Sequence, residues 1–84
     1  MVKAMARSTN REINKAIKKA TGYDIKVFKS YGCCSFYSDD NETEDMLARF
    51  YSTTEYVNSI NQLTVQQWVD SFKFLLKENN VIPH

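Results

Sequence analysis

Residues 63–76 read LTVQQWVDSFKFLL and predict the helix around which the rest of the chain is arranged. Thr64 and Gln67 have the spacing of a capping box, in which each side chain bonds the free backbone N–H of the other residue, and Leu63 precedes the cap as in a hydrophobic staple. Apolar residues then recur at helical intervals and form one stripe: Val65, Trp68, Val69, Phe72, Leu75 and Leu76. The stretch therefore predicts an amphipathic C-terminal helix whose stripe faces the core.

A second helix is predicted near the start of the chain, over residues 10–21. Thr9 and Glu12 repeat the capping-box spacing at its N-terminus. Behind this cap lies another apolar stripe: Ile13, Ala16, Ile17 and Ala20. Gly22 follows and supplies the left-handed residue that commonly ends a helix.

Between the two helices the hydrophobic period changes from that of a helix to that of a strand. Residues 23–29 alternate apolar and polar side chains, and residues 33–38 can pair with them across a turn at Gly32, because glycine tolerates a positive φ. The acidic run 39–45 favours a short helix, since negative charge is stabilising at a helix N-terminus. Residues 53–58 predict a short third strand.

The order helix, strand, strand, short helix, strand, helix predicts an α+β fold. We expect a small antiparallel sheet of about three strands, with the N- and C-terminal helices packed on one face. The 84 residues, 43% hydrophobic and 25% charged, fit a single domain over 1–84 with an ordered core at about 8–78 and frayed termini. No run approaches the roughly 20 apolar residues of a membrane span, and no secretory signal begins the chain. We therefore expect a cytoplasmic protein.

Residues that commonly carry catalysis or bind metals are scarce in this chain. Cys33 and Cys34 are adjacent, so on a strand they point to opposite faces and a disulfide between them would be strained. The only histidine is His84, the last residue, whereas a zinc site needs about four ligands. The sequence has no Gly-rich phosphate loop and no nucleophile with an internal histidine to activate it. We expect no metal, no cofactor and no enzymatic activity.

Charge is distributed unevenly along the sequence. Residues 1–29 hold eight Lys or Arg and two Asp or Glu, a net +6, whereas residues 39–70 hold one Arg and seven acids, a net −6. On the first helix the cations lie opposite the apolar stripe and form a basic face: Arg11, Lys15, Lys18 and Lys19. Such a face is either an ordinary solvated surface or a docking surface for an acidic partner or a nucleic-acid backbone.

The acidic run and two aromatic residues are further candidates for partner binding. The acids of the run are Asp39, Asp40, Glu42, Glu44 and Asp45. They indicate the solvated start of a helix or, alternatively, a surface that imitates a phosphate track and occupies a nucleic-acid-binding groove of a target. Tyr31 in the turn and Phe74 opposite the stripe of the last helix are expected to be exposed, where they can contact a partner.

Three segments carry a resemblance to known proteins: NREINKA at 10–16, TGYDI at 21–25 and LTVQQWV at 63–69. In this order, around a short hairpin with a central glycine, they resemble a group of small proteins of phages, prophages and other mobile elements. The resemblance implies an accessory protein that binds and blocks a host defence or regulatory complex, as anti-CRISPR proteins do. The implied partner is a host protein or ribonucleoprotein complex, and the implied location is the host-cell cytoplasm.

The order of elements is also similar to that of the double-stranded RNA-binding domain, which uses shape and backbone contacts from basic residues. This chain departs from that domain because its last helix has only Lys73 and Lys77, and because an acidic segment precedes the third strand. The sequence thus favours a non-enzymatic inhibitor of a host defence complex. The alternative is a small nucleic-acid-binding accessory protein that uses the basic first helix.

Overall fold

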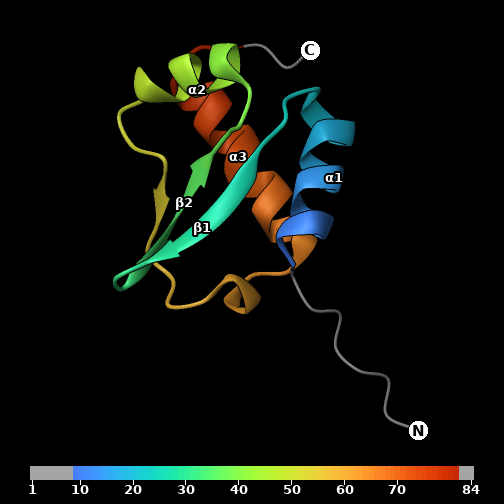
Figure 1. The fold of residues 1–84 in the computed structure, drawn as a ribbon, viewed down its shortest axis with the longest axis vertical. Coiled ribbons are helices and arrows are strands. Elements are labelled where there is room, and N and C mark those ends of the chain that lie inside the picture. The colour runs from blue at the N-terminus through green and yellow to red at the C-terminus, as the bar shows by residue number, and fades with distance from the viewer. Residues whose placement is uncertain (1–8, 82–84) are drawn as a thin grey trace, which may run out of the picture.

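The computed structural model describes residues 9–81 of the chain and shows an α+β fold (Figure 1). Its helices are α1 (Asn10–Thr21), α2 (Asn41–Ala48), the 3₁₀ helix η1 (Ile60–Gln62) and α3 (Val65–Glu78). Its strands are β1 (Lys26–Ser30), β2 (Cys33–Tyr37) and β3 (Thr54–Glu55). The predicted order of elements is confirmed, with η1 as an addition. The termini expected to be frayed lie before residue 8 and after residue 78; of these, residues 79–81 are described and residues 1–7 and 82–84 lie outside the described residues.

Both long helices begin where their local sequences predict, and α1 also ends there. At the start of α1, the backbone N–H of Glu12 donates to Thr9 Oγ1 at 3.2 Å, and Gly22 ends the helix in the left-handed conformation, at φ 84°. At the start of α3, Thr64 and Gln67 form the predicted capping box with hydrogen bonds of 3.1 and 2.8 Å. These caps bind backbone donors that have no partner within the helix.

The sheet is antiparallel, in the order β1-β2-β3. A tight turn joins β1 to β2, and Gly32 adopts φ +71° there, a conformation that other residues rarely take. The third strand is shorter than the predicted range of 53–58 because its register with β2 covers only Thr54 and Glu55, although Thr53 O also accepts from Phe36 N at 2.9 Å. Beyond them the chain turns away, since the N–H of Val57 bonds back to Glu55 O at 2.9 Å.

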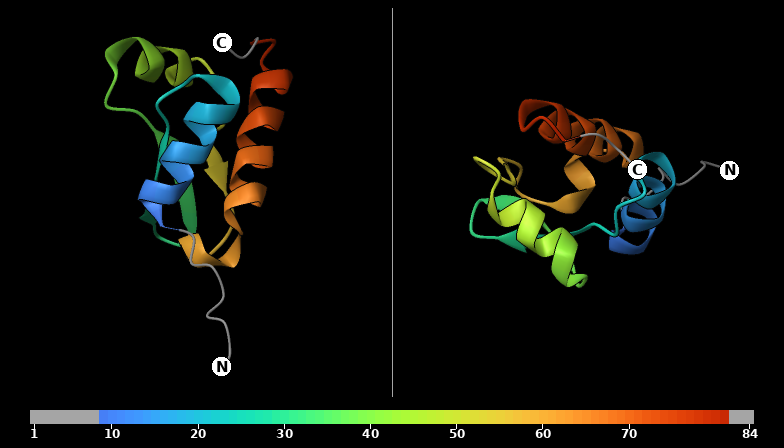
Figure 2. Two further views of the ribbon diagram at one scale, coloured as in Figure 1. Left: turned by 90° about the vertical axis from the view of Figure 1, so that its right-hand side faces the viewer. Right: turned by 90° about the horizontal axis from the view of Figure 1, so that it is seen from above.

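The two long helices lie on one side of the sheet, as predicted. The helix α3 crosses behind the β1–β2 hairpin, while α1 stands beside β1 and packs against α3 (Figures 1 and 2). The short helix α2 closes one end of the sheet, next to β2. Within residues 9–81 no helix covers the opposite, outer face of the hairpin.

The core lies between the sheet and the two long helices. Trp68 and Phe72 of α3 are fully buried and meet Phe36 of β2 edge-to-face, at ring-centroid distances of 5.6 and 5.3 Å. The indole N–H of Trp68 donates to Ile60 O at 2.9 Å and so connects α3 to η1. The other buried hydrophobic residues surround this aromatic cluster: Ile13, Ile17, Ile25, Val27, Cys34, Leu47, Phe50, Val69 and Leu76.

Candidate functional site

The basic face predicted on α1 lies on the surface. Its members are all exposed: Arg11, Lys15, Lys18 and Lys19. Spacings of three or four residues place these cations side by side along the helix. Within residues 9–81 the one ion pair joins Lys26 to Asp39, so none of the four cations has a carboxylate within salt-bridge distance there. The face therefore presents to solvent positive charge that no ion pair within residues 9–81 neutralises.

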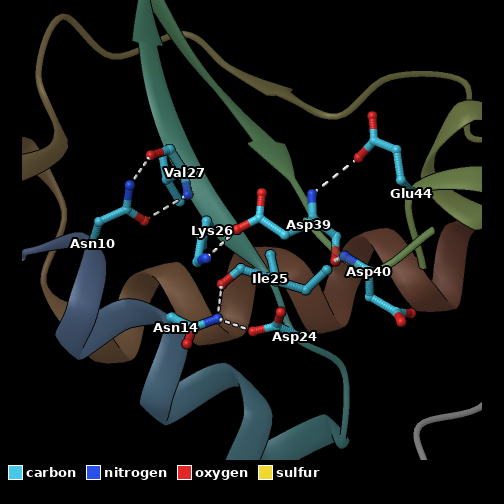
Figure 3. Close-up of polar contacts among 10 residues, drawn as sticks. Asn10, Asn14, Asp24, Ile25, Lys26, Val27, Asp39, Asp40 and Glu44 are labelled. Atoms are coloured by element: carbon cyan, nitrogen blue, oxygen red, sulfur yellow. Dashed lines mark hydrogen bonds and ion pairs between the residues drawn. The ribbon is translucent and has the colours of Figure 1, made fainter. Parts of the chain in front are cut away.

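The acidic run is partly occupied by contacts within the fold (Figure 3). Asp40 is the N-cap of α2, and its carboxylate accepts hydrogen bonds from Thr43 Oγ1 at 2.7 Å and from Thr43 N at 3.0 Å. These two bonds hold the pKa of the Asp40 carboxyl below its ordinary value. Glu44 accepts a hydrogen bond from Ser38 N at 2.9 Å and so braces the connection between β2 and α2.

A third acid of the run, Asp39, is paired with a cation. It binds the ammonium of Lys26, and this hydrogen bond raises the pKa of Lys26 above its ordinary value. Glu42 and Asp45 are exposed carboxylates on α2, and within residues 9–81 neither forms an ion pair. The structure thus separates the acidic run into residues that hold the start of α2 and residues that face solvent.

Two depressions border α1. The first has a volume of about 400 Å³ and brings Lys18 of the basic face beside acids of the run; its lining is Lys18, Gly22, Tyr23, Asp24, Asp40, Glu42, Thr43 and Met46. The second, which we call the α1–sheet groove, has a volume of about 370 Å³ and is lined by Asn10, Arg11, Asn14, Lys26 and Tyr37. This groove leads from the basic face of α1 to the outer face of the sheet.

Two asparagines of α1 occupy the free edge of β1, which sequence reasoning missed (Figure 3). Asn10 Oδ1 accepts from Val27 N at 2.8 Å, and Asn10 Nδ2 donates to Val27 O. Asn14 Nδ2 donates to Ile25 O at 2.8 Å and to Asp24 Oδ1 at 2.7 Å. The carboxamides therefore act as strand partners, which fixes the wall of the α1–sheet groove and covers backbone groups that could pair with another chain.

The exposed aromatic residues lie on different elements. Tyr31, at the tip of the hairpin, is fully exposed, and Phe74 on α3 is 60% exposed, so both are on the surface as expected. Sequence reasoning did not single out Phe28, which is 46% exposed on the outer face of β1 and meets the ring of Tyr37 edge-to-face at 5.6 Å. The sequence did indicate that Phe28 faces outward, because it occupies one of the polar positions in the alternating pattern of residues 23–29.

The cysteines show no geometry for a metal site. Cys34 is buried in the core, where loss of hydration raises the pKa of its thiol, and Cys33 is half-buried on the opposite face. Over the described residues no group of three or more His, Cys, Asp or Glu side chains lies close enough to hold a metal ion. His84 lies outside those residues.

Among the helices described, none is long and apolar enough to cross a membrane.

No protein-family model, curated protein or solved structure matches this chain. The surface features that remain as candidate binding sites are the basic face of α1, the α1–sheet groove beside it and the exposed acids of α2.

Proposed function

We propose that the protein is a non-catalytic binding protein that docks on an anionic surface of a larger host complex. The observation that carries the proposal is the exposed basic face of α1, whose cations form no ion pair within residues 9–81: Arg11, Lys15, Lys18 and Lys19. Like charges at these spacings destabilise a helix by about 0.2–0.5 kcal/mol per pair. An anionic partner removes this repulsion, so part of the binding energy comes from the relief of a cost that the free protein bears.

The acidic run supports docking less well than the basic face does. Asp39, Asp40 and Glu44 each make a contact that holds the fold together at the start of α2. A partner that bound these carboxylates would compete with those contacts. Glu42 and Asp45 are then the exposed acids that remain, and two carboxylates are few for a surface that imitates a phosphate track.

The identity of the host complex is proposed from the sequence resemblance to phage and mobile-element proteins. A small accessory protein of this kind acts in the host-cell cytoplasm by covering a functional surface of a defence complex, such as a CRISPR effector. Complexes that contain or bind nucleic acid offer phosphate groups, which are the chemical complement of a helix face lined with lysine and arginine. The basic face and the proposed target class are therefore compatible.

A second candidate function is direct binding of free nucleic acid. The α1–sheet groove favours this alternative, because Arg11 and Lys26 share it with the aromatic ring of Tyr37. A helix followed by three antiparallel strands and a helix is also the layout of the double-stranded RNA-binding domain. The acidic surface of α2 departs from that domain, so we place this function second.

Affinity capture from extract of the host cell, with and without nuclease, tests the two candidates. We expect the wild type to recover one stoichiometric complex after nuclease treatment, and a variant with Lys15, Lys18 and Lys19 changed to Glu to lose it. The matched control carries Glu42→Gln and Asp45→Asn, which change exposed charges without touching a contact of the fold.

Three results of the capture experiment would point away from the first candidate function. Undiminished capture by the folded lysine variant would refute docking through the basic face. Recovery that vanishes with nuclease would favour free nucleic acid as the partner. Loss of capture in the Glu42 and Asp45 variant alone would move the binding surface to α2.

A further inference from the structure

The outer face of the sheet carries a pair of aromatic rings, of which Phe28 is exposed and Tyr37 is half-buried. Side chains alternate along each strand, and Val27, Cys34 and Phe36 point into the core. The alternate residues therefore form the outer face: Lys26, Phe28, Ser30, Cys33, Ser35, Tyr37 and Thr54. Phe28 is 46% exposed there, and its ring lies 5.6 Å from that of Tyr37, at an interplanar angle of 70°. Hydroxyl groups surround the rings, and the face has no aliphatic side chain.

Positive charge borders these rings on one side. Lys26 and Arg11 line the α1–sheet groove together with Tyr37, whereas Lys29 lies opposite Cys34 on the other face of the hairpin. The one carboxylate at this border, Asp39, is already bound to Lys26. A ligand that crosses from the basic face of α1 to the outer face of the sheet thus meets cations first and aromatic rings next.

This combination distinguishes between classes of anionic ligand. The core of a protein interface is usually enriched in apolar side chains, whereas this face offers two aromatic rings among hydroxyls, with Lys26 and Arg11 at its border. Aromatic rings beside a positively charged groove are typical of surfaces that bind single-stranded nucleic acid, because every base has a face that can stack. In a duplex the bases are already stacked on one another, so such rings find no free face.

We propose that the anionic ligand is single-stranded nucleic acid, which binds across the α1–sheet groove with bases stacked on Phe28 and Tyr37 and phosphates beside Arg11 and Lys15. This inference rests on the proposed docking through the basic face and names the chemistry of the surface that is bound. The strand belongs to the host complex, where bound proteins protect it from nuclease. Recognition is independent of base sequence, since stacking and phosphate contacts carry no sequence code.

Fluorescence anisotropy with a labelled twelve-nucleotide oligothymidylate, and with a mixed-sequence duplex of the same length, tests the inference. We expect the single strand to bind more tightly than the duplex at equal salt. Phe28→Leu keeps an apolar side chain but removes the ring, so it weakens single-strand binding about tenfold without changing the salt dependence. Arg11→Gln lowers the slope of log affinity against log salt by about 0.7, the value for one lost phosphate contact on a single strand.

Phe74→Leu is the matched control, because it removes an exposed ring of α3 that lies on another element. Equal affinity for single strand and duplex, or equal effects of Phe28→Leu and Phe74→Leu, would overturn the stacking surface while leaving docking through the basic face in place. No salt-dependent binding to either probe would also overturn it, and nuclease-resistant capture from extract would then show whether the basic face binds an acidic protein.

A second measurement needs no variant. Photocrosslinking of the wild type to a 5-iodouracil oligonucleotide, mapped by mass spectrometry, is expected to give adducts at Phe28 or Tyr37. Adducts confined to the exposed tyrosines elsewhere on the surface, Tyr31, Tyr51 and Tyr56, would contradict the inference.

Discussion

Replacement of Trp68 by alanine probes the central packing of the fold. Trp68 is the largest fully buried side chain, with its ring edge-to-face with Phe36 and its indole N–H bonded to Ile60 O at 2.9 Å. The change Trp68→Ala removes the ring that connects α3, β2 and η1. We expect the variant to be strongly destabilised while Phe74→Ala, on the same helix, is not.

The magnitude follows from buried area and from the lost hydrogen bond. Truncation to alanine takes roughly 150 Å² of apolar surface out of the core, worth about 4 kcal/mol at about 25 cal/mol per Å². The indole hydrogen bond adds about 1 kcal/mol. Tryptophan-to-alanine changes in protein cores cost about 3–5 kcal/mol, and we expect a value in this range. A domain of 84 residues has a total stability of about 4–13 kcal/mol, so the loss is a large share of it.

Urea unfolding followed by far-ultraviolet circular dichroism measures this loss, because the variant lacks the indole fluorophore. Trp68→Phe retains a ring but leaves Ile60 O without its donor, so it should cost about 1–2 kcal/mol. Phe74→Ala should stay within about 0.5 kcal/mol of wild type, since Phe74 is 60% exposed. A loss below about 1 kcal/mol for Trp68→Ala, or one no larger than that of Phe74→Ala, would refute this account of the core.

Three further predictions concern the edge of the sheet, its turn and a helix cap. Asn10→Ala uncovers the edge of β1 at Val27, so it should lower the free energy of unfolding in urea by about 1–2 kcal/mol and increase self-association in sedimentation. Unchanged stability would contradict the role of Asn10 as a strand partner. Gly32→Ala should lower the melting temperature by about 4–8 °C, which corresponds to a loss of about 1 kcal/mol of stability. The loss comes from the positive φ of +71° alone, because an added Cβ meets nothing within 4 Å. An unchanged melting temperature would show that the turn tolerates alanine. The lowered pKa of Asp40 stabilises the fold above the ordinary aspartate value of 3.8, and this contribution disappears as the pH falls from there through the lower folded pKa. Asp40→Asn does not titrate, so its unfolding free energy should fall less steeply over that acid range, and equal slopes would contradict the cap assignment.

The helices were predictable because their signals are local. Thr9, Gly22 and Thr64 act on backbone groups within a few residues, and the stripes of α1 and α3 pack as their spacing indicates except at Ala20, which is exposed while the neighbouring Thr21 is buried. The sequence also carried a usable signal for η1, which the prediction missed. Ser59 and Gln62 have capping-box spacing, and Gln62 Oε1 accepts from Ser59 N at 3.1 Å.

The extent of β3 was not predictable, because it depends on partners distant in the sequence. Residues 53–58 have strand-like composition, but the pairing with β2 ends where the N–H of Val57 turns back to Glu55 O. A propensity for extended structure does not show how many residues find a partner. The short strand is thus a consequence of the path that leads into η1.

The candidate site was predictable in its charges and not in its contacts. The basic face follows from helical spacing, and its exposure is as expected. Nothing local shows that Asp39 binds Lys26 or that Glu44 binds Ser38 N. The place of Phe28 beside Tyr37 depends on the register of the hairpin, which the turn and the core set together.

The contact between α1 and β1 has a consequence for the alignment of the two elements. Four residues of helix advance about 6 Å and two residues of strand about 6.7 Å, so Asn10 and Asn14 meet Val27 and Ile25 with nearly equal repeats.

A slide of α1 by one turn would therefore keep an amide opposite Val27 and would bring Lys18, also a donor, opposite Ile25. The same slide would move the buried Thr21 into the place of Ile17, so that a hydroxyl-bearing side chain would replace an isoleucine in the core. The hydrogen bonds from Asn10 and Asn14 to the edge of β1 set the direction and spacing of the helix. The choice between neighbouring alignments depends on Thr21 and on Gly22, where the helix ends.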